Sequence, residues 1–235
     1  MPADFYPVAI HHGLLFDLRD DAYPTVVFGV AGDRHALAAD DTHFGLVTDG
    51  KITLDRGRDR FTLGQGSFFV VPGDGCVDGS DGRCLVISRL QYRGLFQIGG
   101  PLEPQGRLRY IDGCSDTLLV CPPRLGEPCL NHLHIPPGTH QSSHSHPSER
   151  IGVIAAGHGT CVTDRGRYPL SPGMAWRIPT GSRHCFLTTD ERLDVLAWHP
   201  DTDFGPTDEN HPMLNRTFLR PAAPAAGITQ QRTDI

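Results

Sequence analysis

Two histidines separated by a single residue, His144 and His146, have the type and spacing needed to bind a metal ion. Side chains alternate between faces in an extended segment, so both imidazoles are expected to point the same way. A third imidazole, His184, follows thirty-eight residues later, just past a Pro/Gly turn from which an antiparallel fold could return it to the first two. Three ring nitrogens leave coordination positions open, which is typical of a reactive metal centre rather than a closed structural one.

Glycines and a proline stand at fixed intervals around these histidines. The first interval is Gly, five residues, His-Ser-His and a later Gly, and the second is Gly, five residues, Pro-Thr-Gly, two residues and His. Both intervals resemble the two motifs of the cupin superfamily, through Gly138, His144, His146 and Gly157 and through Gly173, Pro179, Gly181 and His184. The resemblance implies an all-β fold of cupin barrels, also called double-stranded β-helices or jelly rolls.

The sequence departs from the family pattern at the position where a glutamate or glutamine usually serves as a further ligand. Arg150 stands there, and a guanidinium stays protonated and cannot bind a cation. Glu149 is one residue early, so on a regular strand it would face away from the histidines, although a bulge could re-aim it. We therefore predict a three-histidine site in which Arg150 anchors a substrate carboxylate and Glu149 is a candidate proton carrier.

The two halves of the chain are repeats, related by an offset of 107 residues. That offset pairs Gly50 with Gly157, Gly66 with Gly173 and Pro72 with Pro179. It also places Leu37, Ala39 and Val77 where the three histidines stand, so the first copy has lost its ligands. We predict two tandem barrels, a degenerate one over residues 1–110 and a metal-binding one over residues 111–219, followed by a disordered Ala/Pro tail over residues 220–235. The first copy is expected to be structural, with His43 as the one polar sign of a second small-molecule pocket.

Composition agrees with a turn-rich β protein. The 235 residues include 27 glycines and 20 prolines, which bound short runs of Val, Ile, Leu and Phe. A net charge of -6 argues against nucleic acid as a partner. The N-terminus does not resemble a signal peptide and no apolar run approaches membrane-spanning length, so a cytoplasmic location away from membranes is expected. Seven cysteines without a Cys-x-x-Cys pair argue against a disulfide framework.

Other residues near the motifs allow two interpretations. His132 and His134 share one face of a strand and could either line the pocket as acid–base groups or be ordinary hydrogen-bonded strand histidines. His140 is expected in a turn. Trp176 alternates with Arg177, so either one could form the pocket wall. The polar segment over residues 199–216 is predicted to be a lid, a dimer contact or a plain surface loop.

Neutral imidazoles suit several divalent metals, of which zinc is preferred here and iron is the alternative. Zinc would act as a Lewis acid or activate water, and iron would add dioxygen chemistry. The predicted function is therefore a metal-dependent enzyme acting on a small polar, carboxylate-bearing metabolite, with a homodimer as one option for its assembly. Two alternatives remain. A weaker similarity to the cupin part of hydrazine-forming enzymes implies N–N bond formation from amino-acid-derived substrates, and a cupin barrel can also serve as a non-catalytic small-molecule sensor.

Overall fold

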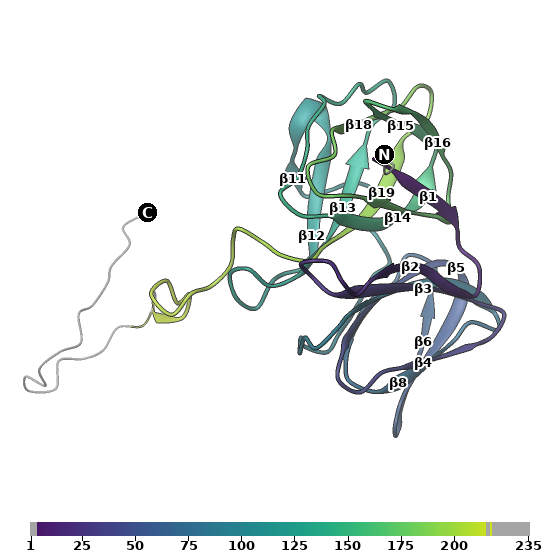
Figure 1. Ribbon diagram of the computed structural model, residues 1–235, viewed down its shortest axis with the longest axis vertical. Helices are drawn as coiled ribbons and strands as arrows, with labels where there is room; N and C mark the ends of the chain where they lie inside the picture. The colour runs from purple at the N-terminus through teal and green to yellow at the C-terminus, as the bar shows by residue number, and fades with distance from the viewer. Residues whose placement is uncertain (1–3, 215–216, 218–235) are drawn as a thin grey trace, which may run out of the picture.

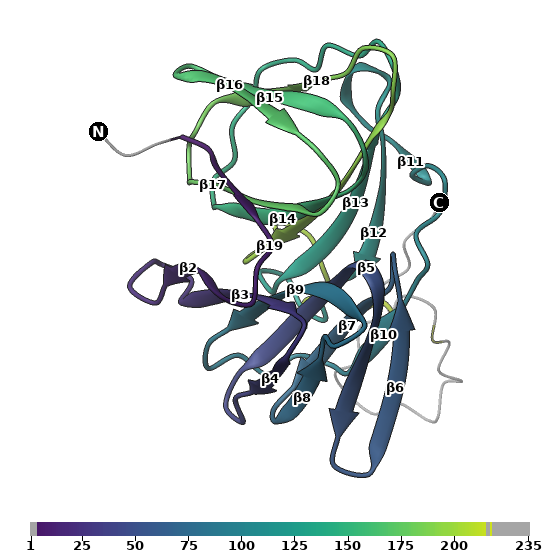
Figure 2. The same ribbon diagram turned by 90° about the vertical axis from the view of Figure 1, so that its right-hand side faces the viewer.

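The computed structural model describes residues 4–214 and residue 217. Within that part of the chain the regular structure is almost entirely β-strand, with η1 (Ile111–Gly113) as a short 3₁₀ turn, so the all-β prediction is confirmed. The strands form two barrels, one above the other in Figure 1 and in the turned view of Figure 2. The Ala/Pro tail predicted over residues 220–235 lies outside the described residues.

The first barrel is built around one long strand. β5 pairs with β7 and β9 through its first half and with β6 and β8 through its second half, so it belongs to both layers of the barrel. The strands of this barrel are β2 (Gly13–Leu18), β3 (Thr25–Ala31), β4 (Arg34–Leu37), β5 (Thr42–Arg56), β6 (Asp59–Gly64), β7 (Phe68–Pro72), β8 (Gly75–Asp78), β9 (Gly82–Arg89) and β10 (Gln97–Gly99).

The second barrel consists of a seven-stranded sheet facing a three-stranded one. The larger sheet runs β1-β17-β14-β19-β13-β12-β11 and the smaller runs β16-β15-β18. The strands of this barrel are β1 (Tyr6–Ala9), β11 (Leu108–Arg109), β12 (Ser115–Val120), β13 (Cys129–Ile135), β14 (Arg150–Gly157), β15 (Gly159–Thr163), β16 (Gly166–Leu170), β17 (Met174–Ile178), β18 (His184–Leu187) and β19 (Leu193–His199).

The division of the chain between the barrels differs from the expected one at two strands. β1 and β11 lie within residues 1–110, yet they hydrogen-bond to β17 and β12 of the second barrel. The physical reason is edge protection, because a sheet edge exposes unpaired backbone groups that another strand can satisfy. The N-terminus of the described chain therefore crosses over to complete the sheet that carries the histidine-bearing repeat.

The repeat inferred from the sequence reappears in backbone detail. The pairing of β5 with β9 shifts register between Val47 and Asp49, and the pairing of β14 with β19 shifts between Ile154 and Ala156. Both shifts occupy the same positions under the offset of 107. Gly50 and Gly157, which follow the shifts, both have a positive φ (61° and 72°) that favours glycine. After this shared register shift the chain passes from one layer of its barrel into the next, within β5 in the first copy and from β14 to β15 in the second.

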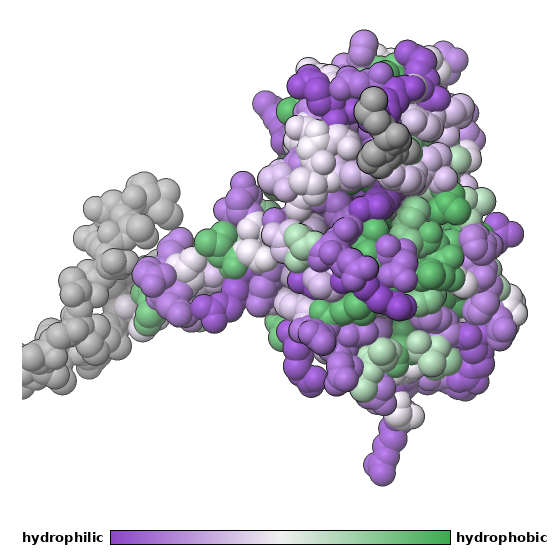
Figure 3. Space-filling view, viewed as in Figure 1, coloured by the Kyte–Doolittle hydropathy of each residue, from purple (hydrophilic) through white to green (hydrophobic). Residues whose placement is uncertain are grey.

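The two barrels share one hydrophobic core. Alternate residues of β5 and β9 in the first barrel and of β14 and β19 in the second point toward each other, and the buried cluster includes Phe44, Leu46, Leu85, Ile87, Ile151, Val153, Leu196 and Trp198. The outer surface also shows apolar side chains where the barrels meet, near β2 in Figure 3, and Leu14 of this edge strand is 46% exposed. The shared core holds the seven-stranded sheet of the second barrel against the first barrel.

Candidate metal centre

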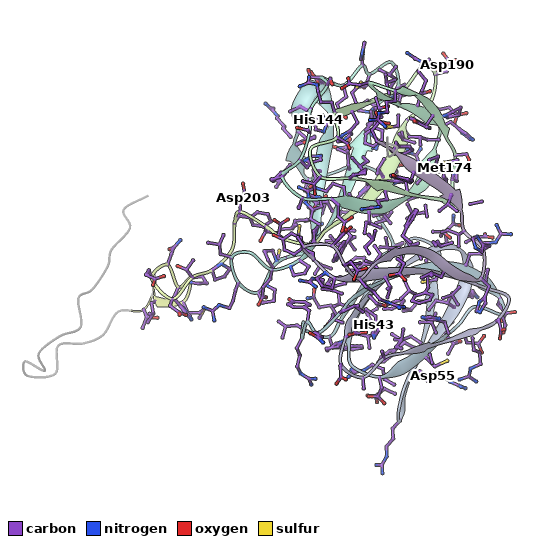
Figure 4. All side chains as sticks on the ribbon, in the orientation of Figure 1. His43, Asp55, His144, Met174, Asp190 and Asp203 are labelled. Carbon is purple, nitrogen blue, oxygen red and sulfur yellow. The ribbon has the colours of Figure 1, made fainter. Side chains whose placement is uncertain are left out.

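Three histidine side chains converge at one end of the second barrel. His144, His146 and His184 each offer a ring nitrogen, and these three atoms all lie within 4.8 Å of one another. The ring centroids of His144 and His184 are 4.5 Å apart. The ring centroid of His146 lies 5.0 Å from that of His144 and 5.2 Å from that of His184. Figure 4 labels His144 in the upper barrel, far from His43 of the lower one. The sequence-distant histidines thus form one cluster.

Backbone pairing brings the two sequence segments together. His144 and His184 form an isolated antiparallel bridge, in which each backbone N–H donates to the carbonyl oxygen of the other at 2.9 Å. The neighbouring N–H of Gly181 donates to the carbonyl oxygen of His146 at 2.9 Å. The Pro-Thr-Gly turn before His184 is therefore pinned to the His-Ser-His segment, which places the third ring against the first two.

Hydrogen bonds fix the ring orientation of two of the histidines. Nδ1 of His144 lies 2.8 Å from the carbonyl oxygen of Ser142, and Nδ1 of His184 lies 3.0 Å from that of Ser182. A carbonyl oxygen only accepts, so Nδ1 carries the proton in both rings and Nε2 keeps its lone pair. A ligating histidine commonly has this arrangement, because the second nitrogen's bond sets the tautomer and the ring orientation.

The electrostatics of the cluster favour neutral rings. Burial, followed by the charge of Arg150, lowers the pKa of His146 to about 3, and burial lowers the pKa of His184 to about 4. Both imidazoles are thus uncharged near neutral pH, as a metal ligand must be. A set of three neutral nitrogen donors fits a divalent cation such as zinc or iron and leaves positions for water or substrate.

The histidines line a cavity of about 240 Å³ inside the barrel. Its walls are mainly apolar, with the buried ring of Trp176 among them, so the tryptophan rather than Arg177 faces the interior. At the mouth lie Leu108 and Tyr110, whose exposed fractions are 65% and 40%. The lining residues are Leu108, Arg109, Tyr110, Asp116, Asn131, Leu133, His144, His146, Arg150, Trp176, Ile178, His184, Phe186, Val195, Ala197 and His199. This is a small pocket in which about half of the lining residues carry polar or charged side chains and the others contribute a mainly apolar surface.

Arg150 lines this cavity, and one nitrogen of its guanidinium already has hydrogen-bond acceptors. Nη1 donates to the hydroxyl and carbonyl oxygens of Ser148 at 2.6 Å and 3.1 Å, and to the carbonyl oxygen of Glu149 at 3.0 Å. Nε is buried and has no hydrogen-bond partner within the described part of the chain. Burial lowers the pKa of Arg150, although Asp201 opposes this shift, and a guanidinium still remains charged. A buried cation with an unsatisfied donor is suited to an anionic ligand.

Glu149 does not reach the cavity, which corrects its predicted role as proton carrier. Its Oε2 accepts a hydrogen bond from Nε of Arg177 at 2.9 Å, and Arg177 also pairs with Asp21 of the first barrel at 2.9 Å. Strand alternation directs Glu149 to the face opposite Arg150, and no bulge re-aims it at this position. Burial raises the pKa of Glu149, but Arg177 opposes that shift. The carboxylate joins the two barrels instead of serving the site.

His132 and His134 also face away from the cavity. His132 Nε2 and His134 Nδ1 lie 3.0 Å and 2.8 Å from the same carboxylate oxygen of Asp194, and Arg192 bonds the other oxygen at 2.7 Å. Asn131 and Leu133, which alternate with these histidines, line the cavity. The hydrogen-bonded interpretation of His132 and His134 is therefore the one the structure supports. His140 lies outside the cluster, beside a larger and more open groove of about 480 Å³ without converging ligand groups.

His199 is a cavity residue that sequence reasoning missed. Its ring centroid lies 6.4 Å from that of His146, and burial, followed by Arg150, lowers its pKa well below the usual value. Val195, Ala197 and His199 all line the cavity because they alternate along β19. Extending that alternation by one residue past Trp198 would have identified His199. The cavity wall also contains the Asp116–Asn131 pair, which is joined by a 2.8 Å hydrogen bond.

The segment after β19 does not cover the cavity in the described residues. Leu125 N–H donates to the carbonyl oxygen of Pro206 at 3.0 Å, and Arg124 pairs with Asp208 at 3.3 Å. Figure 4 labels Asp203 where this segment leaves the second barrel. Residues 200–208 thus run along the loop before β13, and no described residue beyond His199 is among those that line the cavity.

The first barrel holds no counterpart of the centre at the repeated positions. Leu37 and Val77, which stand at the positions of His144 and His184 in the repeat, are buried in its core. His43 is also buried, with Nδ1 2.7 Å from the Ser88 hydroxyl and Nε2 3.0 Å from the Ala38 carbonyl oxygen. Both ring nitrogens are therefore occupied by the barrel's own groups. His43 offers no free polar atom for the second small-molecule pocket considered above.

The fold and the cluster define a β-barrel protein with three histidines converging in an internal cavity. Residues 131–199, which contain all three histidines, match the family model described as Cupin domain. The second barrel is accordingly similar to the Cupin domain family over these residues. The comparison of the sequence with curated proteins gave no match.

Solved structures with the same fold include proteins of different descriptions. A cupin 2 conserved barrel domain protein from Leptotrichia buccalis has 13% identity and a TM-score of 0.58, covering 84% of this chain and 89% of its own. Protein Ylba from E. coli has 15% identity and a TM-score of 0.58, and the match covers 87% of this chain and 85% of Ylba. Salicylate 1,2-dioxygenase from Pseudaminobacter salicylatoxidans has 12% identity and a TM-score of 0.56, covering 75% and 70%. At these identities the likeness shows the fold alone.

No helix among the described residues is long and apolar enough to span a membrane.

Proposed function

We propose that this protein is a metal-dependent cupin enzyme that acts on a small carboxylate-bearing metabolite at the three-histidine centre. The observation that carries the proposal is the convergence of His144, His146 and His184 at one cavity that also contains the guanidinium of Arg150. A cation and a buried guanidinium in one apolar pocket attract the same kind of ligand, a small anion. The two groups can hold one molecule at two points.

The three histidines would hold the metal through their free nitrogens. Bound there, zinc would supply Lewis-acid chemistry or an activated water, and iron would supply dioxygen chemistry. The chain's own contribution is to keep the imidazoles of His146 and His184 neutral, to orient those of His144 and His184 through Ser142 and Ser182, and to limit water in a cavity of about 240 Å³.

Arg150 would bind the substrate carboxylate. Its Nη1 is already engaged, whereas Nε has no partner within the described residues, so the edge formed by Nε and Nη2 remains for a ligand. A carboxylate matches that edge with two parallel hydrogen bonds. The remainder of the substrate would contact Trp176, Phe186 and the neighbouring apolar wall, which favours a compact molecule with an apolar body.

Two other polar residues of the cavity wall, His199 and Asp116, are candidates for accepting or donating a proton. His199 lies in the cavity beside His146, and its lowered pKa keeps it neutral, so it can accept a hydrogen bond from a substrate or water. Burial raises the pKa of Asp116, while a hydrogen bond from Asn131 opposes that shift. These residues replace Glu149, which faces the other side of the strand.

Metal analysis of the purified protein and of a His144→Ala variant tests the proposal. One equivalent of a divalent metal in the wild type and its loss in the variant, with activity lost in parallel on a carboxylate substrate, would support an enzyme. Metal-dependent binding of small carboxylates without turnover would instead favour the sensor alternative. Normal metal content in the variant would remove the proposed centre.

A further inference from the structure

We propose that Tyr23 of the first barrel is a positioning residue for Arg150, acting through Asp201 and Ser148. The inference rests on the proposed function, because it assigns Arg150 a ligand-binding edge whose orientation matters. It adds a role for the first barrel, which has no histidine ligands at the repeated positions. That barrel would set the direction of the guanidinium in the second barrel's cavity.

A continuous chain of hydrogen bonds links the two residues. The hydroxyl of Tyr23 donates to Oδ2 of Asp201 at 2.9 Å, and the hydroxyl of Ser148 donates to Oδ1 of the same carboxylate. Nη1 of Arg150 donates to the Ser148 hydroxyl oxygen at 2.6 Å. Tyr23 and Arg150 lie 127 residues apart in the sequence and on different barrels.

The direction of each bond in the chain is fixed. A carboxylate at neutral pH only accepts and a guanidinium only donates. Ser148 has a single hydroxyl proton, which goes to Asp201, so its oxygen is left to accept from Arg150. The carboxylate thereby strengthens the hydroxyl as an acceptor, and the Ser148 bond holds Nη1 rather than another nitrogen of the guanidinium.

Holding Nη1 decides which edge of the guanidinium is free. Nη1 has three acceptors, the hydroxyl and carbonyl oxygens of Ser148 and the carbonyl oxygen of Glu149. Nε is buried and unpartnered within the described residues. Without the Ser148 hydroxyl, rotation about the last side-chain bonds would let another nitrogen turn toward the backbone carbonyls. The ligand-binding edge would then lose its single orientation.

Tyr23, at the far end of this series of hydrogen bonds, is held in place by contacts within the first barrel. The guanidinium of Arg89, on β9, lies over the ring of Tyr23 with its carbon 5.5 Å from the ring centroid. Arg89 also donates to the carbonyl oxygen of Pro24 at 3.0 Å, and the Thr25 hydroxyl donates to the carbonyl oxygen of Tyr23 at 2.7 Å. Tyr23 therefore enters the contact from the loop between β2 and β3, where its ring and its backbone carbonyl are both held.

The test uses the full-length protein and the NMR signal of the Arg150 side-chain Nε–Hε group, which needs no substrate. Loss of one signal in Arg150→Lys assigns it. In Tyr23→Phe and in Ser148→Ala we expect this signal to shift and its proton to exchange with water at least about tenfold faster than in the wild type. Ser148→Thr keeps the hydroxyl and should restore the wild-type signal.

Tyr92→Phe is the matched control. The hydroxyl of Tyr92 donates to Oε2 of Glu127 at 3.2 Å, another tyrosine–carboxylate bond that leaves Arg150 untouched. An Nε–Hε signal unchanged in Tyr23→Phe, or changed equally in Tyr92→Phe, would overturn the positioning role. Metal content and carboxylate binding test the proposed function separately, so a protein that binds no carboxylate would still give a clear answer on positioning.

Discussion

The ring of Phe44 on β5 packs against the indole of Trp198 on β19, with ring centroids 5.7 Å apart and planes inclined by 58°. One residue belongs to each barrel, and both are almost fully buried. The next residue after Trp198 is His199, which faces the cavity from the other side of the sheet. The core between the barrels is therefore also the support of the cavity wall.

Phe44→Ala is expected to destabilise both barrels together, because their core is continuous. Removing a buried phenylalanine costs about 3–5 kcal/mol. Chemical denaturation followed by tryptophan fluorescence and by far-UV circular dichroism should show one shared transition at a lower midpoint. Two separated transitions, with only one of them shifted, would show that the barrels unfold independently.

His144→Ala should abolish stable metal binding while the protein stays folded. Loss of even an outer-shell partner costs about 10–100-fold in metal affinity, so loss of a ligand should cost at least that much. Elemental analysis after dialysis measures the effect, and circular dichroism checks the fold. His158→Ala is the control, because this exposed histidine pairs with Glu191 away from the cavity and its loss should leave metal content unchanged.

Arg150→Ala should weaken binding of a carboxylate probe without lowering metal content. Removing one partner of a buried charge pair costs about 2–5 kcal/mol, which corresponds to a dissociation constant at least about 30-fold higher. Calorimetric titration of the metal-loaded protein with benzoate measures this, and neutral benzamide should bind wild type and variant alike. Arg183→Ala serves as the control, since this exposed arginine bonds Ser143 near the cluster. Lost metal with unchanged benzoate binding would assign Arg150 to structure.

Asp194 should make the protein sensitive to acid. Burial alone would raise the pKa of this carboxyl, but hydrogen bonds from His132, Arg192 and His134 hold it at about 2. Because the folded-state pKa lies below the unfolded value, the stabilisation is present above about pH 4 and is lost as the pH falls toward 2. It amounts to roughly 2 kcal/mol. Between pH 6 and pH 3 the unfolding free energy should fall further in the wild type than in Asp194→Asn, and an equal or smaller fall in the wild type would contradict this assignment.

Gly152→Ala should destabilise the wall beneath the cavity. A Cβ at this position would collide with the carbonyl oxygen of Leu196 and lie 2.6 Å from the ring of Trp176. Overpacking of this kind costs about 1–3 kcal/mol, and a backbone atom cannot move aside as a side chain can. Gly64→Ala is the matched strand control, because a Cβ there has no neighbour within 4 Å. Thermal unfolding of the two variants compares them, and equal midpoints would contradict the predicted crowding.

The sequence by itself determined the fold class and the histidines that cluster. Glycine and proline spacing marks the turns, and the offset of 107 exposes the repeat, because both are local properties of the chain. Side-chain alternation put His144 and His146 on one face and correctly separated Arg150 from Glu149. It left the role of Glu149 open, because alternation gives a face but does not name what packs against that face.

Only the tertiary structure decided which groups share the cavity and which join the barrels. The pairing of β1 with β17, the contact of Glu149 with Arg177 and the link from Tyr23 to Arg150 each connect residues far apart in the chain. His199 enters the cavity because β19 pairs between β13 and β14, an order that no local pattern specifies. Long-range pairing depends on how complete surfaces fit together, so the sequence identified the three clustered histidines while the packing of two barrels defined the pocket around them.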